Sequence, residues 1–135
     1  MIVADLATLT GRTYPARRRT QNLVGGASPI QAKNFSMGFV TLEPNGGQVP
    51  WHNQNQEEVY FIIEGTGEAC LGTERQTLAA GQAAYIPCGV FHQLTNVGTT
   101  PLAEASAVAG ATVSARRTFA GNDPAAGSPD GNAWP

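Results

Sequence analysis

Charged side chains are scarce in this sequence of 135 residues, because Asp, Glu, Lys and Arg together make up only 13% of it. The formal net charge at pH 7 is -2, so the chain lacks the broad positive field that attracts nucleic acids or anionic lipids. Long hydrophobic runs are also missing, and none reaches the length of a membrane span. We therefore expect no nucleic-acid partner and no membrane partner, and a small molecule is the favoured ligand.

Cysteine is nearly absent as well, and Cys70 and Cys88 are the two present. Two thiols at this spacing provide neither a disulfide framework nor a zinc or redox motif, so we interpret them as half-buried thiols. The start of the chain lacks the basic-then-apolar order of a secretory signal, which predicts a cytoplasmic location.

What the sequence does contain is a series of short β-strand patterns. Hydrophobic residues make up 41% of the chain, enough for one domain with one apolar core. The clearest strand is expected at residues 58–63, where aromatic and β-branched side chains predominate. Further strands are expected, between turns rich in Gly and Pro, at residues 35–42, from about 49, 68–72, 76–78, 83–86 and 92–96. Strands this short and regularly spaced predict an all-β sandwich or barrel.

Both ends of the chain differ from this middle part. Residues 1–34 are mixed and polar, and we interpret them as an N-terminal arm with one or more short strands. Residues 102–115 are mostly Ala with few large apolar side chains, which predicts a weak edge strand or a changed terminus. Residues 116–135 end in a stretch rich in Gly, Pro, Asn and Asp, which predicts a flexible tail. The barrel itself is therefore expected at residues 35–115.

Three side chains of the kind that bind metals, His52, Gln54 and Glu58, have even numbers within one extended segment. Alternate side chains of a strand project from the same face, so all three are expected to point into the barrel. Burying an imidazole, an amide and a carboxylate together is unfavourable unless something pairs with them, and a divalent cation would do so. His92, on a separate strand, can supply a fourth ligand from across the barrel.

The spacing of these residues resembles two sequence motifs of the cupin superfamily. The first motif is matched at Gly46, His52, Glu58 and Gly65, and Gln54 stands where the motif has a second His. The second motif is matched at all its specified positions, Gly81, Pro87, Gly89, His92 and Asn96. Each match has a chance of roughly one in twenty, so nine at fixed spacing are very hard to dismiss. The resemblance covers residues 46–96 and implies a small single-domain cupin, a double-stranded β-helix or jelly-roll barrel with a metal near its centre.

The resemblance implies one divalent metal ion, held by His52, Gln54, Glu58 and His92. Two His and one Glu form the ligand set of non-haem Fe(II) sites, which leave positions open for substrate or dioxygen. An amide oxygen is a weaker ligand than imidazole, and we interpret Gln54 as a change that retunes the metal rather than one that abolishes binding. Manganese, zinc and nickel stay open beside iron.

Two functions stay open at this point. The first is a metalloenzyme that acts on a small polar organic substrate as a dioxygenase, isomerase or lyase. By analogy with other cupins, Glu58 or Tyr60 would then serve as the catalytic acid or base. The second is a non-catalytic module that binds a sugar or small acid, with a structural metal or none. The fold does not choose between them. Many cupins pair through sheet edges, so we also expect a homodimer.

One run of like charge, Arg17-Arg18-Arg19, stands out in the N-terminal segment. Such a run is usually a solvated stretch. A sharper hypothesis is that this segment folds over the barrel mouth, where one arginine binds a carboxylate or phosphate of the substrate with both arms of its guanidinium group. Strand parity also predicts that Tyr60, Ile62 and Leu94 line the barrel interior.

Overall fold

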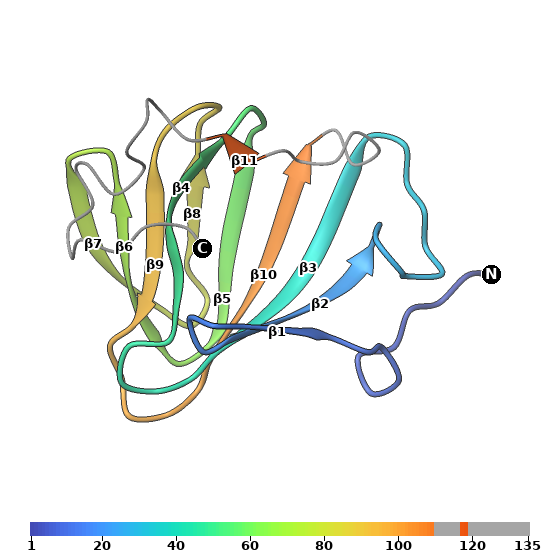
Figure 1. The fold of residues 1–135 in the computed structure, drawn as a ribbon, viewed down its shortest axis with the longest axis horizontal. Coiled ribbons are helices and arrows are strands. Elements are labelled where there is room, and N and C mark those ends of the chain that lie inside the picture. The colour runs from blue at the N-terminus through green and yellow to red at the C-terminus, as the bar shows by residue number, and fades with distance from the viewer. Residues whose placement is uncertain (110–116, 119–135) are drawn as a thin grey trace.

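The computed structural model of the chain describes residues 1–109 and 117–118, which form strands, turns and loops without a helix (Figure 1). Within that part of the chain, no helix of the length and apolarity needed to cross a membrane is found. In chain order the strands are β1 (Arg12–Tyr14), β2 (Arg18–Val24), β3 (Phe35–Leu42), β4 (Gln48–Gln54), β5 (Glu58–Glu64), β6 (Thr66–Leu71), β7 (Glu74–Ala79), β8 (Ala83–Ile86), β9 (His92–Asn96), β10 (Leu102–Ala109) and β11 (Arg117–Thr118).

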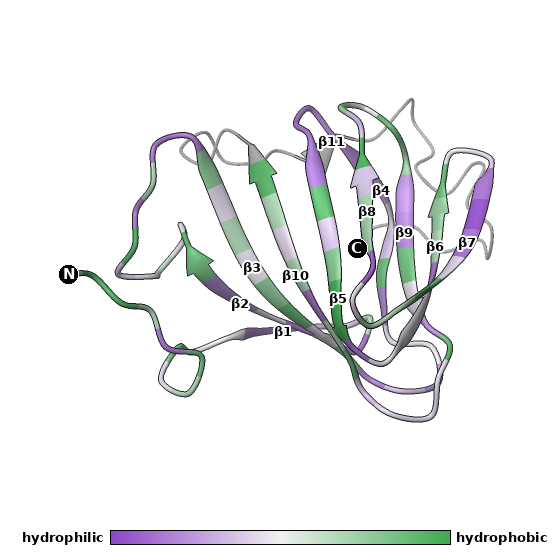
Figure 2. Cartoon of the chain, turned by 180° about the vertical axis from the view of Figure 1, so that it is seen from behind, coloured by the Kyte–Doolittle hydropathy of each residue, from purple (hydrophilic) through white to green (hydrophobic). Residues whose placement is uncertain are grey.

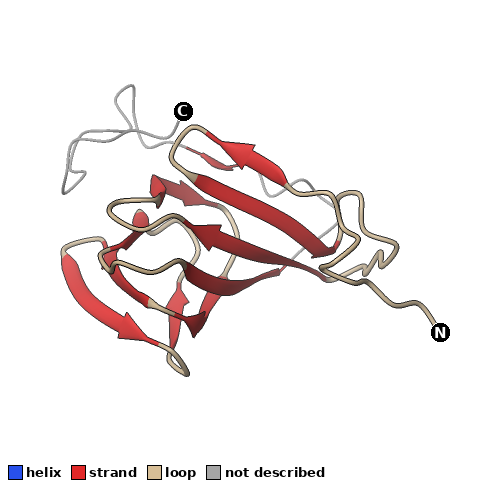
Figure 3. Cartoon of the chain, turned by 90° about the horizontal axis from the view of Figure 1, so that it is seen from below, coloured by secondary structure: helices blue, strands red, loops and turns tan. Residues whose placement is uncertain are grey.

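The strands form two antiparallel sheets. One has six strands in the order β1-β2-β3-β10-β5-β8, and the other has five in the order β11-β4-β9-β6-β7. Seen from below, the two sheets curve toward each other around a common interior (Figure 3). This arrangement confirms the prediction of an all-β sandwich or barrel.

Strand positions follow the sequence pattern closely in the middle of the chain. β3, β8 and β9 begin and end at the predicted residues, and β5 extends the predicted strand by one residue. On β5 the side chains alternate as expected, since Tyr60 and Ile62 are buried while Phe61 and Ile63 are exposed. The strong alternation of large apolar residues explains why this part of the fold was predictable.

The Ala-rich segment is where the expectation of an edge strand was wrong. β10 lies in the middle of the six-stranded sheet and pairs with β3 on one side and β5 on the other. Its even-numbered side chains point inward and are buried, and these are Leu102, Glu104, Ser106 and Val108. Ala is a poor strand former, but pairing on both edges and burial of every second side chain outweigh that preference. Residues 110–116 and 119–135, which include most of the predicted tail, lie outside the described residues.

The outward-pointing alanines of β10 lie on the outer face of the six-stranded sheet. Ala105 lies between Phe39 of β3 and Phe61 of β5 in the strand register, and Ala107 lies between Met37 and Val59. Figure 2 shows apolar bands that alternate with polar ones along β3, β10 and β5. In the strand register, the small alanine side chains therefore lie between two rows of larger apolar residues.

Part of the predicted N-terminal arm is built into the fold. Residues 12–24 contain β1 and β2, and β2 pairs with β3 along the edge of the six-stranded sheet. The side-chain amide of Gln21 donates hydrogen bonds to the backbone carbonyls of Leu6 (2.8 Å) and Leu9 (3.0 Å), which ties the preceding turn to this strand. Arg18 is only 2% exposed, so the run of arginines is not uniformly solvated.

The hydrophobic core lies between the two sheets. It consists of Val40, Leu42, Val49, Tyr60, Ile62, Ala69, Leu78, Ile86, Leu94 and Leu102. The interior positions predicted for Tyr60, Ile62 and Leu94 are confirmed, because none of the three is more than 3% exposed. Of the two thiols expected to be half-buried, Cys70 is buried and Cys88 is exposed.

Two motif residues that were expected to be structural have clear structural contacts. The amide nitrogen of Asn96 donates hydrogen bonds to the carbonyls of Leu42 (3.0 Å) and Thr100 (2.9 Å). Gly65 has a φ of 89°, and a Cβ atom there would lie 2.7 Å from the carbonyl oxygen of Pro101. Only glycine fits a left-handed position with backbone so close.

Candidate metal centre

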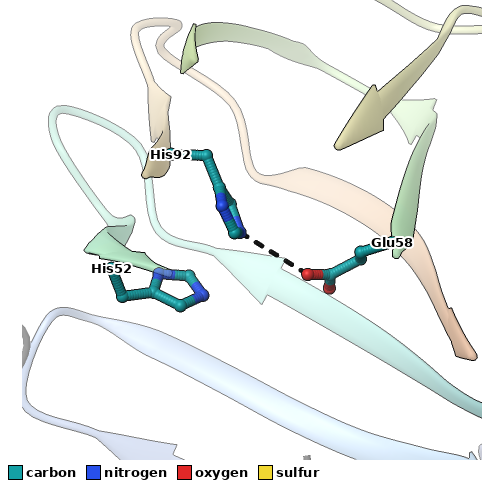
Figure 4. A group of neighbouring side chains, drawn as sticks. All are labelled: His52, Glu58 and His92. Atoms are coloured by element: carbon teal, nitrogen blue, oxygen red, sulfur yellow. Dashed lines mark ion pairs between the residues drawn. The ribbon is translucent and has the colours of Figure 1, made fainter. Parts of the chain in front are cut away.

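Three strands bring the predicted ligands together. His52 and Gln54 lie on β4, Glu58 begins β5, and His92 begins β9, where it pairs directly with His52. All four side chains are buried, with exposed fractions of 1%, 3%, 6% and 0% in chain order. One potential ligand atom from each of His52, Glu58 and His92 lies within 4.8 Å of the other two. Figure 4 shows these three side chains reaching toward one another.

The hydrogen bonds of the two histidines decide which ring nitrogen faces the cluster. Nδ1 of His52 lies 2.6 Å from the carbonyl oxygen of Pro50, and Nδ1 of His92 lies 2.9 Å from that of Val90. A carbonyl oxygen only accepts, so each Nδ1 must carry the proton and donate it. In a neutral ring Nε2 then keeps its lone pair, which is the state of a metal-binding histidine.

Glu58 is the centre of the polar contacts in this cluster. Its Oε1 accepts a hydrogen bond from Oγ of Ser106 (2.6 Å), and its Oε2 accepts one from Nε2 of Gln54 (2.6 Å). Nε2 of His92 lies 3.5 Å from Oε2 of Glu58 and has no hydrogen-bond partner among the described residues, although His92 is fully buried (Figure 4). The sequence interpretation missed Ser106, because nothing in an Ala-rich segment marks one serine as a partner of Glu58.

A cation fits this donor set. Two imidazole nitrogens and one carboxylate are ligands that iron, zinc, manganese and nickel all accept. A metal ion would also satisfy the buried Nε2 of His92, which costs free energy if it stays without a partner. The cluster of His52, Glu58 and His92 could therefore hold a metal ion.

Gln54 and Tyr60 are placed at the margin of the cluster. The amide of Gln54 contacts Glu58 through its nitrogen, and a half-turn of the amide would present its oxygen in the same place. The ring of Tyr60 lies edge-on to that of His92, with 5.8 Å between the centroids. A role for Gln54 as fourth ligand, and for Glu58 or Tyr60 as acid or base, stays a prediction.

A cavity of about 180 Å³ adjoins the cluster and is lined by Gln54, Glu58 and Tyr60. Its wall also contains Arg18 from β2 and Glu104 from β10, two charged residues that the motifs did not point to. Glu104 is fully buried. Burial raises the pKa of its carboxyl well above the ordinary value of 4.5, the negative charge of Glu58 raises it further, and the charge of Arg18 opposes both.

The family suggested by the motifs is confirmed by comparison. The family model for the cupin domain matches residues 38–105, and the chain belongs to this family. Among solved structures it resembles the polyketide cyclase RemF from Streptomyces resistomycificus, with a TM-score of 0.73, 18% identity and coverage of 92% of this chain and 89% of that one. It also resembles the DMSP lyase DddQ from Ruegeria pomeroyi, with a TM-score of 0.72, 22% identity and coverage of 84% of this chain and 62% of that one.

A further relative is much longer than this chain. The mannose-1-phosphate guanylyltransferase of Klebsiella pneumoniae is 29% identical over 73 residues, which cover 54% of this chain but only 16% of the relative. The likeness to the two solved structures establishes the fold. Reaction and substrate must therefore be argued from the site itself.

Proposed function

We propose that this protein is a metalloenzyme that binds one divalent cation through His52, Gln54, Glu58 and His92 and acts on a small polar organic substrate. The observation that carries the proposal is the buried Nε2 of His92, which lies 3.5 Å from Glu58 and has no hydrogen-bond partner within residues 1–109 and 117–118. A structural histidine would use both ring nitrogens, whereas this one directs its lone pair into a cluster of other ligands.

When bound, the cation would polarise a substrate oxygen as a Lewis acid or activate dioxygen. The residues of the chain supply the rest of the site. Tyr60 lines the adjoining cavity and is 3% exposed, so its hydroxyl group is a candidate proton donor. Glu58 is the alternative acid or base. The dioxygenase, isomerase and lyase types remain candidates, and the names of the cyclase and lyase neighbours support catalysis in general terms.

Metal content measured on paired variants tests this proposal. Glu58→Gln should abolish stoichiometric binding of iron, zinc, manganese or nickel, as measured by native mass spectrometry and elemental analysis. Glu57→Gln is the matched control, because Glu57 is the exposed neighbour whose carboxylate accepts a hydrogen bond from Tyr85 (2.5 Å). If both variants keep the metal equally, the proposed centre is wrong. A metal-free protein that still binds a sugar or small acid would instead support the non-catalytic module.

We also propose that two copies associate through the outer face of the six-stranded sheet. Large apolar side chains are exposed there, and these are Phe35, Val59, Phe61, Ile63 and Tyr85. A patch of this kind usually marks an interface, and a gently curved sheet face can pair with its own copy about a twofold axis. Light scattering should give a dimer mass for the wild type and a monomer mass for Phe61→Lys. A monomeric wild type would refute this assembly.

A further inference from the structure

Two charged side chains in the cavity are not used by the proposed metal centre. Arg18 is 2% exposed, and its guanidinium carbon lies 3.9 Å from the centroid of the Tyr14 ring. This stacking holds the guanidinium group in one orientation. Glu104 faces the same cavity from β10 and is fully buried.

The two groups influence each other without a direct hydrogen bond. The charge of Arg18 acts on Glu104, yet neither carboxylate oxygen of Glu104 accepts a hydrogen bond from any described residue. Burying a carboxyl group in this way is costly. If the pair had a purely structural role, Arg18 would donate a direct hydrogen bond to Glu104, which would remove that cost. A buried carboxyl group without a hydrogen bond from the described residues is instead expected where a bound ligand donates that hydrogen bond.

The charge around the cavity favours an anion. With a divalent cation bound, the cation and Arg18 together outweigh the two carboxyl groups of Glu58 and Glu104, even when both are ionised. A guanidinium group matches a carboxylate in shape, because both are planar and form two parallel hydrogen bonds. Glu104 adds a carboxyl oxygen that can accept a hydrogen bond from a hydroxyl group.

Resting on the proposed metal centre, we propose that Arg18 and Glu104 recognise a short hydroxy acid, with Arg18 donating to its carboxylate and Glu104 accepting from its hydroxyl group. The cavity volume of about 180 Å³ equals that of about six water molecules. This space fits an acid of a few carbons and is too small for a nucleotide sugar. The chemical class of the substrate is therefore that of lactate or a close analogue.

Calorimetry with four probes tests the class directly on the wild-type protein. Lactate should bind more tightly than propionate, which lacks the hydroxyl group, and than 1,2-propanediol, which lacks the carboxylate. Inorganic phosphate is the fourth probe. If the diol or phosphate binds as tightly as lactate, the inference is overturned without the need for any variant.

Variants then assign the two contacts. Arg18→Gln should weaken lactate binding about tenfold or more, since a hydrogen bond to a charged group is lost. Arg19→Gln is the control, because Arg19 is the exposed neighbour on the same strand and should leave binding unchanged. Glu104→Leu, which has no acceptor atom, should reduce the preference for lactate over propionate about fivefold. Thermal unfolding confirms that each variant is folded, and Arg18→Lys, which keeps the charge, replaces Arg18→Gln if the latter is not.

Metal analysis of the same samples separates this inference from the proposed function. If the wild type holds metal but lactate does not bind, or binds equally to Arg18→Gln, the subsite is refuted and the metal centre stands. If no metal is bound and lactate still binds in an Arg18-dependent way, the subsite stands and the metalloenzyme proposal fails. If Arg18→Gln loses lactate binding but retains the metal, the result supports both the subsite and the metal centre.

Discussion

Removing the hydroxyl group of Ser106 should weaken metal binding although Ser106 is not itself a ligand. Its Oγ donates a 2.6 Å hydrogen bond to Oε1 of Glu58, and both side chains are buried. This bond holds the carboxylate in position and leaves the other oxygen, Oε2, to face His92 at 3.5 Å. In Ser106→Ala the carboxylate loses the hydrogen bond from the Ser106 hydroxyl group and becomes freer to rotate.

The expected size of the effect follows from the chemistry of that bond. A hydrogen bond to a charged group contributes about 1.5–3 kcal/mol, and loss of a partner that orients a metal ligand reduces metal affinity about tenfold to hundredfold. We therefore expect Ser106→Ala to bind zinc or iron about tenfold to hundredfold more weakly than the wild type. A competitive titration against a chromophoric chelator measures this difference.

Ser36→Ala provides the matched control for this titration. Ser36 lines the same cavity from β3, so the substitution makes the same chemical change at a position that donates no hydrogen bond to Glu58 in the described structure. The metal affinity of Ser36→Ala should stay within about twofold of the wild type, because the Glu58 carboxylate keeps its hydrogen bond from Ser106. Equal affinities for Ser106→Ala and Ser36→Ala would refute the positioning role of Ser106.

Three further predictions concern stability and titration. Because burial raises the pKa of Glu104, the native state keeps a proton that the unfolded chain releases, so wild-type stability should fall as the pH rises above the ordinary carboxyl pKa of 4.5. Glu104→Gln should remove that slope in melting curves of chelator-treated protein, and an unchanged slope would contradict it. Gly65→Ala should lower the free energy of unfolding by about 2–4 kcal/mol in urea titrations, since a strained φ and a backbone clash combine. Gly72→Ala, with a left-handed φ but open space around it, should cost only about 1 kcal/mol. His92→Ala should lose the metal yet keep a cooperative transition, and retention of the metal would disprove its role as a ligand.

Only part of the metal-binding cluster could be predicted from short-range regularities of the sequence. The expectation that His52 and Glu58 share one face of a single extended segment was wrong, because a bend separates β4 from β5 and the two strands belong to different sheets, although both side chains are buried between those sheets. His92 needed the family motif, since nothing local says which strand lies opposite β4. The register that pairs His52 with His92 is a long-range property of the sheet.

The inward positions of Arg18 and Glu104 could not be predicted from such local regularities. β2 carries polar side chains on both faces, so period-two alternation gives no sign that Arg18 points inward while Arg19 points to solvent. Glu104 lies among alanines, which predicted a weak edge strand or a changed terminus, and only pairing with β3 and β5 makes the segment a central strand. Tertiary pairing, rather than local preference, decided both positions.

The register of β10 separates the part of the interior that stabilises the fold from the part that binds. At one end Leu102 pairs with Leu42 in the core, and four residues later Ser106 pairs with Tyr60 beside the cavity. The next two inward positions after Leu102, Glu104 and Ser106, are polar and line the cavity together with Val108. Substitutions at Glu104 and Ser106 should therefore alter binding while Leu102 keeps the sheets together, which is why these two buried positions are suitable for testing function.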